Sequence, residues 1–371
     1  MVATGLPFAP ARGFLLLEDG SLFEGEAISS GTRFGEVVFN TSMTGYQEIL
    51  TDPSYRGQIV VMTQPHIGNY GTEEAAEESR HPWAEGFIAR QFTTEVDRST
   101  PLPSYLGEHG IPAVQGIDTR ALVRRLREHG SLKGVLTTER DDLETLAREL
   151  REFPSMTGRA LVDEVTCRDP YELAPRGSET CHLAVFDFGT KANILRQLAA
   201  RGARLTVLPA RTSAAECLAL SPDGIVLSNG PGDPEPLTSI IETVRELVDS
   251  EVPIFGICLG HQLLGLALGA KTVKLKFGHH GGNQPVQDME TGKVTITSQN
   301  HGFAVLASSL PERCEATEIN LNDGTLEGFS VLDRPVFAVQ YHPEAAPGPQ
   351  DASPLFDRFL ARVRSMRKGE P

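Results

Sequence analysis

The second half of the sequence alternates short apolar runs with segments of helical spacing, and this alternation is the strongest constraint on the fold. Strands that alternate with helices and are apolar on both faces form a parallel sheet with helices on both sides. The sequence therefore predicts an α/β domain over 182–371 with a mostly parallel sheet flanked by helices. Strands are expected at 183–188, 204–208, 224–228 and 252–257, and helices at 191–201, 214–220, 237–250, 259–268 and 354–366.

The first 150 residues predict a separate, mixed α+β domain. Asp19-Gly20 is a hairpin turn signal between alternating apolar residues. Asp118 is expected to cap a helix over 119–129 that ends at Gly130. A second amphipathic helix is expected over 141–152. The weakly patterned stretch 151–181 is interpreted as a linker, which gives domains at 1–150 and 182–371.

Composition excludes several classes of function. The 371 residues include 34 basic and 49 acidic side chains, a net charge of −15 without a dense Lys/Arg block, which argues against nucleic acid or anionic lipid as a partner. The five cysteines form no CxxC pair, which fits a reducing cytoplasmic protein better than a disulfide framework or a zinc site. No secretory signal is recognised. The apolar stretch 252–270 is expected to be a buried strand and helix rather than a membrane span.

The sharpest chemical signal is Gly256-Ile257-Cys258-Leu259-Gly260, between an expected strand and an expected helix. The pattern is that of a nucleophile elbow with Cys in place of Ser. The glycines leave room for a tight turn, and the helix N-terminus favours a thiolate. Cys258 is therefore the candidate nucleophile. The alternative is a buried cysteine flanked by packing glycines.

Gln340-Tyr341-His342-Pro343-Glu344 offers the base that a thiol nucleophile requires. In an extended segment residues i and i+2 point the same way, so His342 and Glu344 share a face. His342 would hold the thiol proton, and Glu344 would orient the imidazole. Without the cysteine elbow, the same motif would be read as a surface turn.

A third motif, Leu227-Ser228-Asn229-Gly230-Pro231-Gly232-Asp233-Pro234, follows an expected parallel strand. Binding loops of open α/β sheets gather at that edge. The N–H groups of Gly230 and Leu259 are the expected donors to an oxyanion. The alternative is an ordinary Gly/Pro turn. The adjacent His279 and His280 are not expected to hold a metal, because neighbouring side chains of a strand point apart.

These three motifs resemble those of the triad-type (class I) glutamine amidotransferases. Further motifs narrow the resemblance to the small chain of glutamine-hydrolysing carbamoyl-phosphate synthase, over nearly the whole chain. They are Phe39-Asn40-Thr41-Ser42-Met43-Thr44-Gly45-Tyr46-Gln47-Glu48 with Asp52-Pro53-Ser54-Tyr55, Pro65-His66-Ile67-Gly68-Asn69, Asp187-Phe188-Gly189, Lys276-Phe277-Gly278-His279-His280-Gly281-Gly282-Asn283 and Gln299-Asn300-His301-Gly302-Phe303.

The resemblance implies a Cys258-His342-Glu344 triad that releases ammonia from L-glutamine. It also implies a heterodimer with a large subunit that binds ATP, Mg²⁺ and bicarbonate and makes carbamoyl phosphate for arginine and pyrimidine biosynthesis, with no cofactor in this chain. The N-terminal domain would dock on that subunit while lending Ser42 to the glutamine pocket. The family pattern leads us to expect Ser at 346, where this chain has Ala346. The glutamine-binding positions implied are Ser42, Gly230, Gly232, Leu259, Gln262, Asn300, Gly302 and Phe303.

Two other functions stay open at the level of sequence. A stand-alone cysteine hydrolase, such as a γ-glutamyl hydrolase-like enzyme, would need no partner but leaves the N-terminal domain unexplained. A non-catalytic regulatory subunit would be favoured if a triad position were lost, and all three are present. Deleting residues 1–150 is expected to abolish binding of the large subunit.

Overall fold

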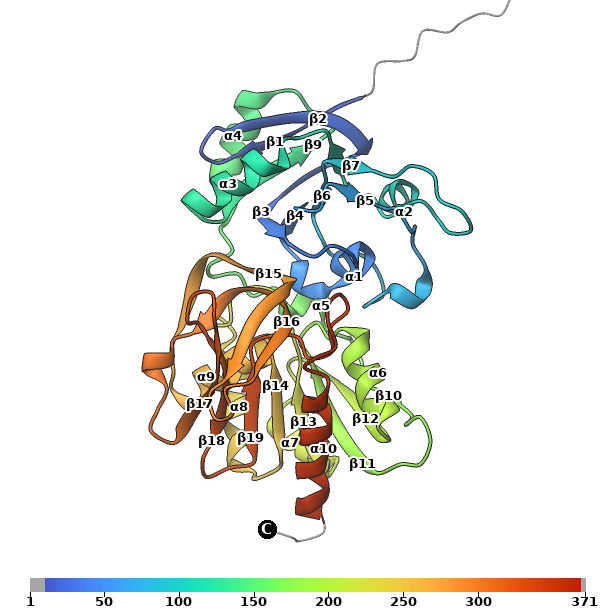
Figure 1. Cartoon of the computed structure of the whole chain (residues 1–371). Coiled ribbons are helices and arrows are strands. Elements are labelled where there is room, and N and C mark those ends of the chain that lie inside the picture. The colour runs from blue at the N-terminus through green and yellow to red at the C-terminus, as the bar shows by residue number, and fades with distance from the viewer. Residues whose placement is uncertain (1–10, 368–371) are drawn as a thin grey trace, which may run out of the picture. The chain divides into compact units, whose positions relative to one another are not determined.

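The computed structural model describes residues 11–367, and the chain divides into two compact units (Figure 1). The first, here called the barrel unit, comprises 1–39, 58–73 and 85–153. The second, the sheet unit, comprises 40–57, 74–84 and 154–371. The division at 153/154 is near the boundary expected from the sequence. The assignment of 40–57 and 74–84 to the sheet unit was not expected, and it puts Ser42 in the same unit as the three candidate triad residues.

Seven strands close the barrel unit in the order β1-β2-β8-β6-β4-β3-β9. Residues of β1 alternate between two clusters: Leu15 and Leu17 pack inside the barrel, whereas Phe14 and Leu16 pack against the outer helix α4. The strands are β1 (Arg12–Leu17), β2 (Leu22–Ser29), β3 (Thr32–Asn40), β4 (Gln58–Met62), β6 (Gly86–Ile88), β8 (Ala113–Gln115) and β9 (Leu132–Thr137), with a small separate pair β5 (His66–Ile67) and β7 (Gln91–Phe92).

The helices of the barrel unit are α2 (Leu102–Glu108), α3 (Thr119–His129) and α4 (Leu143–Glu152). The hairpin at Asp19 and the helix that follows Asp118 are both confirmed. The Asp118 side chain accepts a hydrogen bond from the N–H of Ala121 at 2.9 Å, and Gly130 ends α3 with a φ of 99°. Capping chemistry readable in the sequence therefore sets both ends of α3.

The sheet unit is built on ten strands in the order β10-β12-β11-β13-β14-β19-β18-β17-β15-β16. The pairs from β12 through β19 are parallel, as the α/β pattern predicts, and the remaining pairs are antiparallel. The strands are β10 (Tyr171–Leu173), β11 (Cys181–Asp187), β12 (Ala203–Pro209), β13 (Gly224–Leu227), β14 (Ile254–Ile257), β15 (Thr272–Asp288), β16 (Val294–Val305), β17 (Cys314–Asn320), β18 (Leu326–Val331) and β19 (Val336–Val339).

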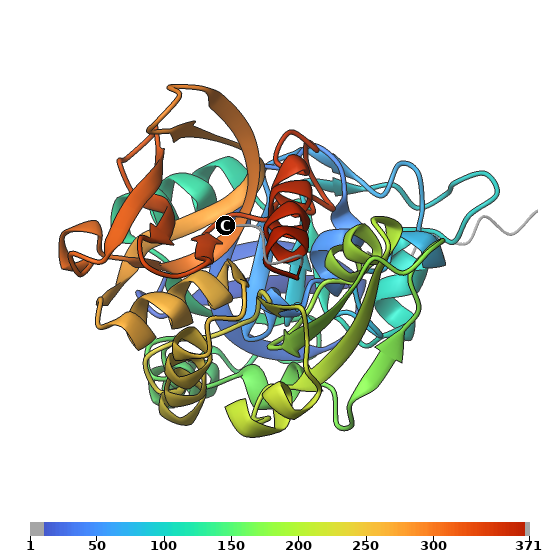
Figure 2. The same ribbon diagram turned by 90° about the horizontal axis from the view of Figure 1, so that it is seen from below.

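Helices cover both faces of this sheet, because successive residues of its strands are apolar on both sides. Phe186 and Leu227 pack with α7, α8 and α9, whereas Val185 and Val226 pack with α6 and α10. In Figure 2 these two sets of helices lie on either side of the strands. The helices are α6 (Ala192–Ala200), α7 (Ala214–Ala219), α8 (Thr238–Asp249), α9 (Leu259–Leu268) and α10 (Pro354–Arg367).

The stretch read as a linker contains structure of its own. It carries the short helix α5 (Val162–Val165), and β10 extends the sheet by pairing antiparallel with β12. Residues 40–57 contribute α1 (Tyr46–Thr51) and the 3₁₀ turn η1 (Pro53–Tyr55), and 74–84 contributes η2 (Glu74–Ala76). The apolar stretch 252–270 forms β14 and α9, and within residues 11–367 no helix has the length and apolar character of a membrane span.

Candidate active site

Cys258 lies at the turn between β14 and α9, where the sequence predicts a nucleophile elbow. Its backbone has φ 54° and ψ −100°, a conformation that a side chain rarely adopts. Such a residue costs about 1–3 kcal/mol and persists only where its surroundings hold it. Here the Cys258 N–H donates to the carbonyl of Val339 on the adjacent strand at 2.9 Å. The side chain is buried at the N-terminus of α9.

The two glycines of the elbow have the steric role that the sequence predicts. A Cβ at Gly260 would lie 2.2 Å from the carbonyl oxygen of Leu227. A Cβ at Gly256 would lie 2.6 Å from a methyl of Leu264. Real Cβ atoms do not approach backbone so closely, so the strand and the helix meet at this turn only because neither position carries a side chain.

His342 and Glu344 follow β19 and form a buried pair. Nδ1 of His342 lies 2.6 Å from Oε1 of Glu344, so the alternate-residue geometry expected from the sequence is present. The His342 N–H donates to the carbonyl of Ser298 at 2.8 Å, which ties this segment to β16. Nε2 of His342 is buried and has no hydrogen-bond partner among residues 11–367. It is therefore available to a reacting group.

Charge keeps both members of the pair ionised. Burial alone would lower the pKa of His342, but the Glu344 carboxylate and the Cys258 sulfur raise it to about 10. Burial would raise the pKa of Glu344, but the cations of Lys191 and His342 lower it to about 2. At neutral pH the imidazole therefore carries a proton beside the Cys258 sulfur.

Two residues that the sequence motifs missed hold Glu344 in place. The ammonium of Lys191 is buried, lies 3.0 Å from Oε1 of Glu344 and also donates to the carbonyl of Ala345. Asn193 donates from Nδ2 to the carbonyl of Glu344 at 2.5 Å. A buried lysine beside a carboxylate is a strong functional signal in a structure. In the sequence, Lys191 precedes an ordinary helix and no local pattern marks it.

The Cys258 sulfur lies among amide groups from three elements. Its thiol donates to the carbonyl of Asn300, and Nε2 of Gln340 donates to the sulfur, each with a 3.7 Å separation. Gln262 on α9 donates from Nε2 to Oε1 of Gln340 at 3.2 Å and to the carbonyl of Phe303 at 2.8 Å. These contacts bring Gln262, Asn300 and Phe303, three of the candidate substrate positions, next to the elbow. Gln340 was not singled out from the sequence.

The side chains of Ser42 and Asn300 differ in whether their hydrogen-bonding groups already have partners within the protein. The Asn300 side chain donates to Asp52 at 2.8 Å, and its oxygen lies 2.9 Å from Nδ1 of His280. Its amide is therefore used within the protein. The Ser42 hydroxyl is buried without a hydrogen-bond partner among residues 11–367. An orphaned buried hydroxyl of this kind is suited to bind a polar ligand.

The loop after β13 carries Gly230 and Gly232. A Cβ at Gly230 would lie 2.2 Å from the carbonyl oxygen of Phe188 and 2.8 Å from a methyl of Leu259, so this loop packs directly on the first residue of α9. The N–H of Leu259 is in the first turn of that helix, where no preceding carbonyl accepts it. The two expected oxyanion donors are thus neighbours. Gly302 lies on β16, partly buried, beside Phe303.

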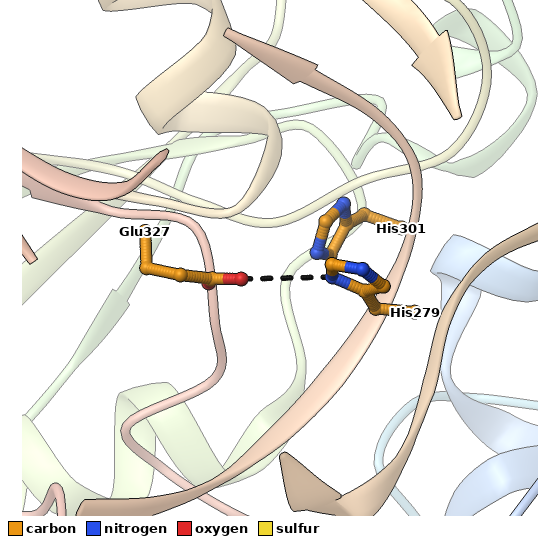
Figure 3. A group of neighbouring side chains, drawn as sticks. All are labelled: His279, His301 and Glu327. Atoms are coloured by element: carbon orange, nitrogen blue, oxygen red, sulfur yellow. Dashed lines mark ion pairs between the residues drawn. The ribbon is translucent and has the colours of Figure 1, made fainter. Parts of the chain in front are cut away.

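A second group of titratable side chains, His279, His301 and Glu327, lies within 4.8 Å (Figure 3). His279 faces two carboxylates, with Nε2 2.8 Å from Asp323 and Nδ1 3.5 Å from Glu327. Burial opposes protonation, but these carboxylates raise the pKa of His279 to about 9. The His279 imidazolium therefore pairs with the Asp323 carboxylate and faces Glu327, whose own pKa is raised by burial.

Comparisons with known proteins agree with this geometry. A family model described as glutamine amidotransferase class-I matches residues 184–362, and one described as the CPSase domain of the carbamoyl-phosphate synthase small chain matches residues 15–136. A carbamoyl phosphate synthase small chain from Pseudomonas aeruginosa is 52% identical over 95% of this chain and 98% of its own. The chain belongs to the carbamoyl phosphate synthase small chain family. Other members are those of Neisseria meningitidis, strain Z2491 (51% identical), and Escherichia coli K12 (50%), each covering 95% of this chain and 98% of the relative.

The two family models match different parts of this member of the carbamoyl phosphate synthase small chain family. The class-I amidotransferase match covers most of the sheet unit, including Cys258, His342 and Glu344. The CPSase-domain match covers residues in the barrel unit and also residues 40–57 and 74–84 of the sheet unit. The family's N-terminal sequence thus contributes to both units.

Proposed function

We propose that this chain hydrolyses L-glutamine to glutamate and ammonia through Cys258, His342 and Glu344. The ammonia passes to a large subunit, which combines it with bicarbonate and ATP into carbamoyl phosphate for arginine and pyrimidine biosynthesis. One observation carries the proposal: a cysteine held in a left-handed elbow at a helix N-terminus beside a buried His342–Glu344 pair. Membership of the small chain family supports the nitrogen donor and the partner.

The chemistry follows from the charges of the site. The Cys258 thiolate attacks the γ-amide carbon of glutamine, and the N–H groups of Leu259 and Gly230 stabilise the oxyanion. The His342 imidazolium gives its proton to the departing nitrogen, which leaves as ammonia. The loss of ammonia leaves a thioester on Cys258. Water then adds to the thioester with His342 as base, and breakage of the C–S bond releases glutamate and restores the Cys258 thiolate and the His342 imidazolium. Glu344 stabilises the imidazolium throughout, and Lys191 keeps Glu344 ionised.

Glutamine recognition is proposed for positions around the elbow. The unpartnered hydroxyl of Ser42 supports a hydrogen bond to the substrate. The contacts of Gln262 with the Phe303 carbonyl support a pocket wall between α9 and β16. The positions are Ser42, Gly230, Gly232, Leu259, Gln262, Asn300, Gly302 and Phe303.

ATP, Mg²⁺ and bicarbonate are proposed to bind the large subunit and not this chain, in a cytoplasmic heterodimer. Hydrolysis of an amide by a thiol nucleophile needs no cofactor, which supports this division. A stand-alone cysteine hydrolase remains the alternative function. It requires full activity without a partner and gives no role to the family's N-terminal domain.

The test is replacement of the nucleophile in the reconstituted two-subunit enzyme. Cys258→Ser nearly conserves volume, so folding and partner binding are expected to survive. An alcohol is hardly ionised near neutral pH and is a much weaker nucleophile. Carbamoyl phosphate synthesis from glutamine is expected to fall by roughly three orders of magnitude or more, while synthesis from added ammonia stays at the wild-type rate. One assay with two nitrogen donors measures both.

Two further variants separate the roles within the triad. His342→Asn is expected to behave like Cys258→Ser, and Glu344→Gln to be milder because an orienting group contributes less than the nucleophile. Wild-type synthesis from glutamine by Cys258→Ser would refute the triad. Full glutamine hydrolysis by the small chain with no partner able to use its ammonia would favour the stand-alone hydrolase.

A further inference from the structure

The barrel unit contains an arginine-lined hollow that plays no part in the amidotransferase chemistry. The hollow has a volume of about 620 Å³, and five of its lining residues belong to α3. Figure 1 shows the position of α3 in the barrel unit. All of its lining residues belong to the barrel unit. Here it is called the α3 groove. Its charged lining consists of Arg90, Arg120, Arg124, Arg127 and Asp118.

Three of these arginines form a stripe on one face of α3. Arg120, Arg124 and Arg127 stand at positions i, i+4 and i+7, which lie on the same side of an α-helix. At a rise of 1.5 Å per residue they extend over about 10 Å. All three are exposed. Arg90 lies near them in the loop that follows β6. Its guanidinium donates hydrogen bonds to the carbonyls of Gly116 and Ile117 at 2.7 and 3.3 Å.

Most of these arginines form no ion pair with a described residue, although the chain has 15 more acidic than basic residues. Among residues 11–367, Arg90, Arg120 and Arg127 form no ion pair, and Arg124 has only the exposed Glu128 at 3.9 Å. The next arginine on the same helix behaves differently: Arg125 lies 2.6 Å from Asp19. Unpaired guanidinium groups side by side repel one another, so an anion that bridges them would be bound favourably.

The shape of the charge indicates an elongated anion. A single phosphate reaches one or two guanidinium groups, whereas the stripe extends over eight residues of helix, from Arg120 to Arg127. Val123, which is partly buried, and Pro65 add apolar contact surface between the charged side chains. A peptide segment with spaced Asp and Glu side chains matches these features.

We propose that the α3 groove binds an acidic segment of the large subunit. The inference rests on the proposed function, which supplies a large subunit as partner. Charge pairs at the edge of an interface act mainly on the rate of association and on register, and they are sensitive to salt. The groove is therefore a steering and docking surface for the partner, separate from the glutamine chemistry.

The experiment titrates the intact small chain against the intact large subunit by calorimetry at low and at high salt. The double variant Arg120→Gln/Arg127→Gln removes two charges that hold no partner within the described chain. Its Kd at low salt is expected to be roughly tenfold higher or more than wild type, with a weaker dependence on salt. Glutaminase activity of the small chain alone is expected to be unchanged. Arg120→Glu/Arg127→Glu is expected to weaken binding further.

Two matched variants complete the test. Arg148→Gln/Arg151→Gln removes two exposed arginines from α4 of the same unit and is expected to keep the wild-type Kd. Arg120→Lys/Arg127→Lys keeps the charge and is expected to recover most of the affinity. A wild-type Kd for the Gln variant at both salts would overturn the proposal, as would binding of ATP or inorganic phosphate by the wild-type small chain that the variant loses. If the wild-type chain failed to bind the large subunit, the proposed function itself would fail.

Discussion

His342 and Glu344 couple the stability of this protein to pH from two sides. The pKa of His342 is raised from 6.5 to about 10, so its contribution to stability is complete below pH 6.5 and is lost as pH rises through 10. The pKa of Glu344 is lowered from 4.5 to about 2, so its contribution is complete above pH 4.5 and is lost as pH falls toward 2. Both contributions are complete between pH 4.5 and 6.5.

Glu344→Gln is expected to bring the pKa of His342 down to 6.5 or below. The variant removes the main charge that favours the imidazolium and leaves the burial that opposes it. An NMR titration of the His342 ring protons measures the change. In the wild type the ring stays protonated through neutral pH, whereas in the variant it is expected to be neutral at pH 8. An unchanged titration curve would contradict the role given to Glu344.

The strained backbone of Cys258 predicts an inverted preference between alanine and glycine. In ordinary helices glycine is less stable than alanine by about 1 kcal/mol. At a φ of 54°, relief of strain of about 1–3 kcal/mol favours glycine. We expect the free energy of unfolding, measured in urea, to be roughly 1 kcal/mol larger for Cys258→Gly than for Cys258→Ala. Ala267→Gly, within α9, is the control and is expected to destabilise. A more stable alanine variant at 258 would contradict the strain.

At the residue scale, the sequence predicts those functional residues that lie in short local motifs. Cys258, His342 and Glu344 stand in short motifs whose spacing carries the chemistry. Lys191 stands in no motif, and Asp52 stands in a stretch, Asp52-Pro53-Ser54-Tyr55, that carries the family resemblance but gives Asp52 no role of its own. Their contacts with Glu344 and Asn300 join residues far apart in the chain. Their importance comes from burial and from partners that only the fold brings together.

At the scale of elements, the junction of β13, β14 and α9 depends on Gly260. Gly260→Ala would bring a Cβ to within 2.2 Å of the Leu227 carbonyl, so the helix or the strand must move. We expect unfolding free energy to fall by about 3 kcal/mol and glutaminase activity to be lost with the displaced Cys258. Urea unfolding and a glutaminase assay measure both effects.

Gly107→Ala is the matched control for the same substitution. Gly107 lies within α2, and a Cβ there meets no atom within 4 Å. The change is expected to stabilise by about 0.5–1 kcal/mol, because alanine restricts the unfolded chain and favours helix. Equal effects of the two substitutions would show that crowding at Gly260 does not matter.

Elements were predictable where apolar periodicity is simple. Strands β11 to β14 and helices α6 to α10 follow from continuous apolar runs and helical spacing, and α3 from its caps. The parallel strand β19 was not among the expected strands. β15 was not predicted as one strand, because its 17 residues include seven polar or glycine residues in a row, Gly278 to Gln284. Its pairing with β16 also shifts register twice. The closed barrel also escaped prediction, since closure depends on pairing between β9 and both β1 and β3.

At the scale of the whole molecule, the sequence predicts a single linker between two domains, whereas the chain passes several times between the barrel unit and the sheet unit. Residues 40–57 and 74–84 belong to the sheet unit although the barrel unit surrounds them in sequence. A linker is recognised in a sequence by a change of pattern along the chain, and these short segments show no such change at their ends. A deletion of residues 1–150 therefore removes part of the sheet unit as well as the barrel. Loss of partner binding in that deletion would have two causes, which the α3 groove variants separate.

The fragment 154–371 is accordingly expected not to fold as a cooperative unit. It lacks Asp52, which accepts from Asn300 and Asn229, and Glu78, which accepts from Arg196 and from the N–H of Asn193. Each buried donor left without a partner costs about 1–3 kcal/mol, so the loss of several is comparable with the roughly 5–15 kcal/mol stability of a typical domain. Thermal unfolding followed by circular dichroism is expected to show no sharp transition for the fragment. In the full chain, Asp52→Ala is expected to lower the unfolding free energy by about 3 kcal/mol while keeping the transition cooperative. A fragment that unfolds sharply at the temperature of the full chain would show that segments 40–57 and 74–84 are dispensable to the sheet unit.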